Sequence, residues 1–95
     1  MTAIPIELCE QVTILNQKGL HARAASKFVK CAGAFESVIE VSRGEMKVSA
    51  TSIMGLMMLA ASQGCSLRIC AYGADAEVAL KAIIQLVNNR FEENE

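Results

Sequence analysis

The chain has 95 residues, which fits one small domain, and 53% of them are hydrophobic, enough to supply a core. Its formal net charge is −1 and aromatic residues make up only 4%, so the totals argue against a surface that binds nucleic acid or an anionic membrane. The N-terminus lacks the pattern of a signal peptide, and the longest apolar run, 53–61, is too short to span a bilayer. Any anion site must therefore be local.

Two kinds of sequence pattern alternate along the chain. Polar–apolar alternation or β-branched composition predicts four strands, at 11–15, 38–42, 46–49 and 67–71. Apolar residues at helical spacing predict three helices, at about 22–32, 53–61 and about 75–89. The order β-α-β-β-α-β-α predicts an α+β two-layer sandwich, an antiparallel sheet with the helices on one face. Periodicity does not predict the order of the strands in the sheet.

The two ends of the chain and its cysteines complete this prediction. The core spans about 11–89, between an N-terminal lead containing Pro5 and an acidic, frayed end that begins at Phe91. The four cysteines form no Cys-x-x-Cys motif, and with a single histidine we expect no metal site. Cys31, Cys65 and Cys70 stand among apolar residues and are predicted to be buried structural thiols. The simplest prediction is a reduced, cytoplasmic protein that needs no cofactor.

The helix predicted at about 22–32 begins with an unusual set of charges. It follows His21, the only histidine, and places Arg23 in its first turn, with Lys18 just upstream. Helices normally favour carboxylates at this positive end of the helix dipole. The helix at 75–89 does so, with Asp75 and Glu77. The first helix therefore has amides that need an acceptor and cations that favour an anion.

Two interpretations of this helix start remain open from the residues alone. In the first, a ring nitrogen of His21 caps the helix and Arg23 points into solvent. In the second, the small residues at the helix start leave room for a bound anion such as phosphate, and Gly19 allows close backbone passage or a left-handed turn. Free imidazole has a pKa near ~6.5, so at neutral pH much of it is an uncharged nucleophile that can also carry a phosphoryl group.

Three short motifs follow one another along the chain: Gly19-Leu20-His21-Ala22-Arg23, Ser52-Ile53-Met54-Gly55-Leu56 and Gln63-Gly64. They resemble the HPr family, the histidine-containing phosphocarriers of the bacterial phosphoenolpyruvate-dependent phosphotransferase system, and the resemblance covers about 11–89 in the right order and spacing. It implies a single HPr-like domain, 1–95, with an open-faced β-sandwich of four antiparallel strands and three helices on one face.

The resemblance also implies roles for individual residues. His21 accepts phosphate at Nδ1 from phospho-enzyme I and passes it to a IIA-type protein, so the chain is a phosphocarrier and not an enzyme. Arg23 matches the arginine that contacts the phosphoryl group, and the backbone amides of Ala22 and Arg23 match the helix-end donors. Ala24 departs from the family, which usually has proline there. We expect this alanine to leave carrier activity intact and to change its rate.

The second predicted helix carries the remaining site residues. Ser52 is placed to cap this helix, and the resemblance implies that it is also a regulatory serine, modified by a serine kinase or phosphorylase. Thr51, just before it, departs from commoner versions of the family. The resemblance places Ile53, Met54 and Met57 on an exposed docking surface, where flexible side chains suit several partners. Leu56 and Leu59 are predicted to be core.

Three functions are compatible with these residues. The leading one is a phosphocarrier in sugar uptake or in nitrogen-related regulation. Two segments, SIMGLMMLAASQG at 52–64 and the acidic NNRFEENE at 88–95, resemble the nitrogen-related branch, NPr. The second is a regulatory binding protein that acts through phosphorylation of Ser52 and the Ile53, Met54 and Met57 surface, with His21 silent. The third is a small acyl phosphate hydrolase, for which we find no residue to position water. We expect a monomer that does not bind nucleic acid or insert into membranes.

Overall fold

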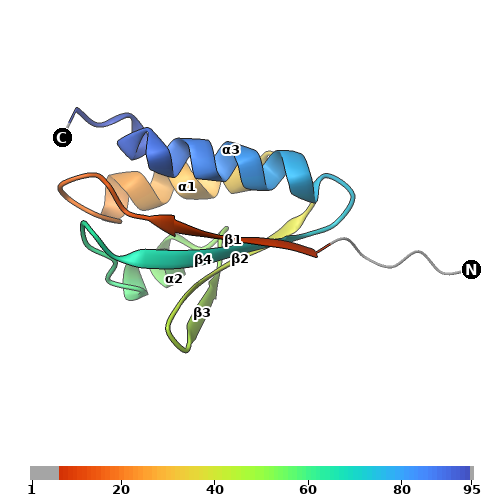
Figure 1. The fold of residues 1–95 in the computed structure, drawn as a ribbon, viewed down its shortest axis with the longest axis horizontal. Helices are drawn as coiled ribbons and strands as arrows, with labels where there is room; N and C mark the ends of the chain where they lie inside the picture. Colours follow the sequence, from red (N-terminus) through yellow and green to blue (C-terminus); the bar gives the residue numbers. More distant parts are fainter. Residues whose placement is uncertain (1–6, 95) are drawn as a thin grey trace, which may run out of the picture.

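Seven regular elements and one short 3-10 turn follow one another along residues 7–94, the part of the chain that the computed structural model describes (Figure 1). The strands are β1 (Glu7–Thr13), β2 (Val38–Arg43), β3 (Met46–Ser49) and β4 (Ser66–Tyr72). The helices are α1 (Ala22–Gly33), α2 (Ile53–Met58) and α3 (Ala76–Asn88), and the 3-10 turn is η1 (Arg90–Glu92). The predicted order of elements is confirmed. The N-terminal lead with Pro5 lies outside the described residues.

The four strands form one antiparallel sheet in the order β1-β4-β2-β3. β4 comes last in the sequence, yet it lies between β1 and β2. β2 and β3 form a hairpin whose turn contains Gly44 at a φ of 60°. β1 and β3 are therefore the edges of the sheet. A strand's own periodicity carries no information about its neighbours, so only the tertiary structure shows this order.

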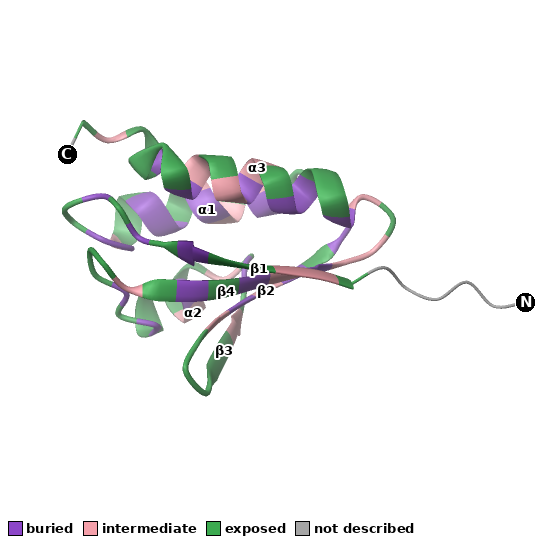
Figure 2. Cartoon of the chain, in the orientation of Figure 1, coloured by how far each residue is buried: buried purple, intermediate pink, exposed green. Residues whose placement is uncertain are grey.

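The helices and the inner face of the sheet enclose one hydrophobic core. α1 and α3 cover one face of the sheet (Figure 1), and α2 packs against α1 and β3. Buried and exposed positions alternate along β4 as a half-buried strand requires (Figure 2). Each helix contributes fully buried side chains, among them Phe28, Leu56 and Ile83. The fold is the predicted open-faced sandwich. Within residues 7–94, no helix combines the length and apolar character needed to cross a membrane.

Two elements, β1 and α2, differ from their predictions by more than one residue at an end. β1 begins at Glu7 rather than at position 11, because Glu7 pairs with Tyr72 at the far end of β4. α2 ends at Met58 rather than at position 61. Ala60 adopts a φ of 51°, which a right-handed helix cannot accommodate, and the Arg43 guanidinium donates to the carbonyls of Leu59 and Ala60 at 2.9 Å.

The start of α3 is tied to the loop that precedes β2. The carboxylate of Asp75 accepts hydrogen bonds from the amides of Glu36 and Ser37, both at 2.9 Å, and from the Ser37 hydroxyl. These bonds, led by the one from the Ser37 side chain, hold the pKa of Asp75 below its usual value. Asp75 therefore joins two segments of the fold instead of capping its own helix.

The prediction of reduced structural thiols was wrong for one cysteine. Cys70 in β4 lies directly opposite Cys9 in β1, and the two are joined by a disulfide. Cys31 and Cys65 are unpaired and half-buried. The pair could not be predicted from the sequence, because its two cysteines are 61 residues apart and become neighbours only when β4 pairs with β1.

Candidate functional site

The loop between β1 and α1 is held in one shape by contacts to the rest of the fold. Gly19 has a φ of 68°, and a Cβ atom there would lie 2.5 Å from the carbonyl oxygen of Ala61. The next residue, Leu20, donates its amide to that same carbonyl at 2.8 Å. Only glycine fits so close to another backbone. The predicted role of Gly19 is confirmed, and the loop delivers His21 to the start of α1 in a defined position.

His21 occupies the N-cap position of α1, but its ring does not cap the helix. The residue has extended backbone angles, and its carbonyl accepts the first helical hydrogen bond, from Ala25 at 2.8 Å. The His21 side chain makes no capping bond to α1, which has no acidic residue in its first turn. The capping interpretation is therefore wrong. The first amides of α1, those of Ala22 and Arg23 included, have no partner within the helix.

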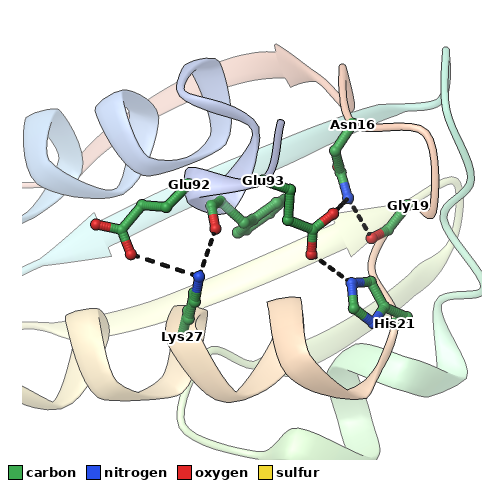
Figure 3. A network of polar contacts seen from close by, with 7 residues as sticks. Asn16, Gly19, His21, Lys27, Glu92 and Glu93 are labelled. Atoms are coloured by element: carbon green, nitrogen blue, oxygen red, sulfur yellow. Dashed lines mark hydrogen bonds and ion pairs between the residues drawn. The ribbon is translucent and has the colours of Figure 1, made fainter. Parts of the chain in front are cut away.

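The His21 ring instead contacts the acidic C-terminal end. Its Nε2 atom lies 2.5 Å from Oε2 of Glu93, and the other oxygen of that carboxylate accepts a hydrogen bond from the Asn16 side-chain amide at 3.0 Å (Figure 3). Asn16 is fully buried and also donates to the Gly19 carbonyl at 2.8 Å. The His21 side chain retains 27% exposure, so the ring is held on one side and open on another.

The ionisation of Glu93 decides which ring nitrogen is free. Burial alone would raise the pKa of Glu93, but hydrogen bonds from His21 and Asn16 and the charge of Lys18 outweigh burial and lower it. An ionised carboxylate can only accept a hydrogen bond, so the facing Nε2 must carry a proton. In a neutral imidazole the proton on Nε2 leaves the lone pair on Nδ1. In the neutral ring, the contact therefore places the lone pair on Nδ1, the nitrogen that does not face Glu93.

The segment that brings Glu93 to His21 is a left-handed turn. Arg90, Phe91 and Glu92 have φ values of 58°, 54° and 64°. Phe91 is fully buried, with its ring centroid 6.4 Å from that of Phe28 in α1. A left-handed residue other than glycine costs about 1–2 kcal/mol, so burial of the phenylalanine has to offset this turn. The predicted frayed end at Phe91 was wrong.

A lysine of α1 fastens the same turn. Lys27 Nζ donates to the Phe91 carbonyl at 2.8 Å and lies 3.5 Å from a carboxylate oxygen of Glu92 (Figure 3). Sequence reasoning missed Asn16, Lys27 and Glu93 as site residues. The signal that could have found the turn is Phe91, the one apolar side chain in an otherwise polar end.

A cleft of about 320 Å³ lies beside the start of α1. Three cationic side chains line it together with polar and acidic residues of the C-terminal end: Lys18, Arg23, Lys27, Glu92, Glu93 and Asn94. Lys18 and Arg23 are therefore brought together, as their positions around His21 suggested, and Lys27 adds a third cation. Arg23 is exposed, so its guanidinium can reach a group that enters from solvent.

The predicted docking surface lies on α2. Ile53, Met54 and Met57 are 40%, 73% and 42% exposed, and Met58, which the prediction did not include, is 64% exposed. Leu56 is fully buried and Leu59 almost fully, so their assignment to the core is confirmed. The exposed side chains of Ile53, Met54, Met57 and Met58 form an apolar patch on one short helix. Such patches are typical of surfaces that bind other proteins.

Ser52 caps α2 as predicted. Its hydroxyl accepts a hydrogen bond from the Gly55 amide at 2.9 Å, and the residue is half-buried. The hydroxyl is thus engaged at the helix N-terminus, where a phosphate would also find backbone donors. In the described part of the chain, no group of three or more histidine, cysteine and acidic side chains is placed to hold a metal ion.

Comparisons with known sequences identify one family of proteins. The family model PTS-HPr, described as "PTS HPr component phosphorylation site", matches residues 8–89. A phosphocarrier protein HPr from Pseudomonas aeruginosa is 46% identical over 86 residues, covering 90% of this chain and 96% of that protein. A phosphocarrier protein NPr from Shewanella violacea is 45% identical over 87 residues, covering 92% and 96%. Overall identity therefore does not separate the two branches.

Solved structures show the same fold. The crystal structure of HPr-C-His from Thermoanaerobacter tengcongensis superimposes with a TM-score of 0.89 at 42% identity, covering 93% of this chain and 99% of that one. A phosphocarrier protein HPr from Bacillus anthracis gives a TM-score of 0.82 at 37% identity, covering 85% and 96%. Sequence and structure comparisons thus converge on one group of proteins.

Proposed function

Because this chain belongs to the HPr family of phosphotransferase-system phosphocarriers, we propose that His21 is the residue that carries the phosphoryl group. As a phosphocarrier the protein is an intermediate in a relay and not an enzyme with its own turnover. The proposal depends on one observation, the contact between His21 Nε2 and the Glu93 carboxylate at 2.5 Å. With Nε2 donating to Glu93, the lone pair of the neutral ring is on Nδ1, the nitrogen that does not face the carboxylate.

The chemical step is an in-line displacement at phosphorus. The lone pair of His21 Nδ1 attacks the phosphoryl group on the donor, a nitrogen–phosphorus bond forms, and the bond to the donor breaks with its electron pair. Nε2 keeps its proton throughout and shares it with Glu93, which stabilises the positive charge that the ring acquires. Return of the phosphoryl group to an acceptor is the same displacement in reverse.

The start of α1 neutralises the charge of the transferred group. The unpartnered amides of Ala22 and Arg23 and the helix dipole supply ~0.3–1 kcal/mol, and up to ~2 kcal/mol in a partly buried site. A charge-assisted hydrogen bond from Arg23 adds ~1.5–3 kcal/mol. Lys18 and Lys27 line the same cleft, where the carboxylates of Glu92 and Glu93 offset part of their charge. The sum orients the phosphoryl group without trapping it, which suits a carrier that must release it.

The donor and acceptors follow from this place in the relay. The donor is phospho-enzyme I and the acceptors are IIA-type proteins, which dock on the patch of Ile53, Met54 and Met57. The exposed thioethers fit partners of different shape, and such relay contacts are small and short-lived. We place this exchange in the cytoplasm, with the chain acting as a monomeric single domain, 1–95.

Ser52 supplies a second, regulatory candidate function. A phosphate on its hydroxyl would stay at the N-terminus of α2 and would add negative charge beside Ile53 and Met54. In that alternative the protein binds partners through α2 according to the state of Ser52. Incubation with a serine kinase and ATP, followed by peptide mass analysis, tests it, and an unmodified Ser52 contradicts it.

One assay tests the carrier proposal. The full chain is incubated with enzyme I and labelled phosphoenolpyruvate, and we expect a label on the protein that is stable in alkali and labile in acid. His21→Ala should carry none, while Ser52→Ala should be labelled like the wild type. Label retained in His21→Ala contradicts the proposal. Steady release of phosphate without a labelled protein would favour an acyl phosphate hydrolase instead.

A further inference from the structure

Two cysteines face each other across the paired strands β1 and β4. Cys9 and Cys70 are direct partners in the antiparallel register, their Cα atoms are 4.0 Å apart, and their sulfur atoms are bonded. Directly opposed residues of antiparallel strands come within ~4.5 Å at non-hydrogen-bonded positions. The pairing of the strands therefore holds the two sulfur atoms together whether or not they are bonded. The phosphotransfer chemistry at His21 uses neither of them.

The pair lies on the face of the sheet that α1 and α3 do not cover. Along β4 the buried side chains are Leu67, Ile69 and Ala71, and Cys70 stands between the last two on the opposite face. Cys9 alternates in the same way with Leu8, which packs against the core. Both cysteines are half-buried rather than enclosed. A small reagent in solvent can therefore reach the pair from the open face.

The other two cysteines differ in ways that make them internal controls. Neither Cys31 nor Cys65 has a sulfur partner among residues 7–94. Burial raises the pKa of the Cys31 thiol, which makes it a poor nucleophile. Hydrogen bonds to Ser62 lower the pKa of Cys65, so it can react singly but cannot form an internal bridge. Only Cys9 and Cys70 combine access with a neighbouring thiol.

We propose that Cys9 and Cys70 form a reversible thiol–disulfide pair, a redox modification site that exchanges with low-molecular-weight disulfides and is reduced by dithiols. The reversibility rests on the cytoplasmic location under "Proposed function", because that compartment keeps accessible disulfides under reduction. A permanent bridge in an enclosed position would not respond to the surrounding thiol pool. This bridge is on an open face, and its two thiols remain aligned after reduction.

Formation of the bond balances as two exchange steps. One protein thiolate attacks a small-molecule disulfide, forms a mixed disulfide and expels one small thiolate. The second protein thiolate then attacks the protein sulfur of the mixed disulfide and expels the other. The two protein thiols lose two protons and two electrons, and the reagent disulfide becomes two thiols. Reduction by a dithiol reverses both steps and leaves the dithiol as a disulfide.

The bond has a structural consequence for the edge of the sheet. β1 pairs only with β4 in the described chain, and β1 leads directly into the loop that carries His21. The disulfide spans 61 residues of sequence, so it restricts the unfolded chain and fixes the edge strand in place. We expect the oxidised protein to unfold at a urea midpoint higher than that of the reduced protein by on the order of 1 M.

The experiment titrates the full chain with mixtures of glutathione and glutathione disulfide. Samples are quenched in acid, free thiols are alkylated with N-ethylmaleimide, and peptide masses locate the label. Cys9 and Cys70 should lose the label together as the mixture becomes more oxidising and regain it with dithiothreitol. The double variant Cys31→Ser/Cys65→Ser should behave like the wild type. Cys9→Ser should show no internal bridge and should leave the urea midpoint independent of the redox mixture.

Two results would overturn the proposal. One is the alkylation of all four cysteines in the most oxidising mixture, because the pair would then not form. The other is a bridge that dithiothreitol does not open in the folded protein, because the bond would then be permanent. Labelling of reduced wild type and of Cys9→Ser by enzyme I and phosphoenolpyruvate is measured in parallel. Absence of that label would contradict the proposed carrier function, while the alkylation pattern would still test the redox pair separately.

Discussion

The N-termini of α1 and α2 differ in how their unpartnered backbone amides are treated. Both begin with amides that have no partner inside the helix. At α2, Ser52 closes the end with its own hydroxyl, which accepts from Gly55 at 2.9 Å. At α1, His21 turns its ring away from the helix and toward Glu93. The first amides of α2 therefore have a local acceptor. Those of α1 have none, and they lie beside a cleft lined by three cationic and two acidic side chains.

Under the proposed function, the difference explains why the start of α1 can bind a transferable anion. A capped end such as that of α2 already has an acceptor, so an incoming phosphate has to replace it. The open end of α1 is kept open because a distant segment, η1 and Glu93, orients the residue that would otherwise cap it. The cap of α2 is therefore local, whereas the proposed reactivity of His21 at the start of α1 depends on the docking of the C-terminal end. Substitutions at Phe91, Glu93, Ser52 and Ala24, each with a control, and a change of pH test this contrast.

Loss of Phe91 should have the largest effect. Phe91→Ala removes a fully buried ring and the contact with Phe28, and it leaves the left-handed turn without the burial that offsets it. We expect a loss of about 3–5 kcal/mol in the free energy of unfolding, measured by urea denaturation. Arg90→Ala, an exposed residue of the same turn, is the control and should lose far less. Equal losses in the two variants would contradict the docking of the turn through Phe91.

Loss of Glu93 should separate the open end from its orienting group. Glu93→Ala removes the acceptor for His21 and for the buried Asn16 amide, so we expect a loss of ~1.5–3 kcal/mol. It also frees the ring to place its proton on Nδ1, which should slow phosphotransfer by at most about tenfold, or ~1.4 kcal/mol. Glu93→Gln retains an acceptor and should slow transfer less. Glu92→Ala, whose side chain is 71% exposed, should lose ~0–1 kcal/mol.

Acid should remove the contribution of Glu93. The pKa of Glu93 is lower in the folded protein than its ordinary value of 4.5, so the ionised carboxylate stabilises the fold above that value. The stabilisation is lost as the pH falls through the lowered pKa of the folded state. The difference in stability between wild type and Glu93→Gln should therefore be largest near neutral pH and shrink below 4.5. A difference that grows in acid would contradict this sign.

Ser52→Ala should weaken the capped end alone. Without the hydroxyl the Gly55 amide loses its acceptor, and caps of this kind contribute ~0.5–2 kcal/mol. Ser52→Asp should preserve the cap and the stability, since a carboxylate also accepts from a helix amide. Labelling of His21 by phosphoenolpyruvate and enzyme I should be unchanged in Ser52→Ala. A loss of label there would mean that the two helix ends are coupled.

Ala24→Pro should have the smallest effect on stability. Ala24 lies in the first turn of α1, where a missing amide removes no bond within the helix, so proline should stabilise by ~0.4–1 kcal/mol and change the transfer rate. Ala25→Pro is the control, because the Ala25 amide donates to the His21 carbonyl at 2.8 Å. That variant should lose ~3 kcal/mol or more. If Ala24→Pro changed neither rate nor stability, the departure from the family would be neutral.

Local patterns were sufficient to predict most elements of the fold. Strand alternation, helical spacing and the turn at Gly44 depend on residues close in sequence, and these predictions were confirmed. The ends of β1 and α2 were wrong because a pairing with Tyr72 extends the strand and a hydrogen bond from Arg43 accompanies the end of the helix. Such contacts join residues that no local window contains.

The site divides in the same way. The sequence by itself determined that one histidine stands at the start of a helix without acidic residues, among cations and small residues, because these are neighbours along the chain. Only the tertiary structure decided which ring nitrogen of that histidine faces a carboxylate. Glu93 reaches it across 72 residues through a left-handed turn anchored by Phe91, and Cys9 meets Cys70 through strand pairing. Packing and hydrogen bonds act through space, so a pattern along the chain cannot contain them.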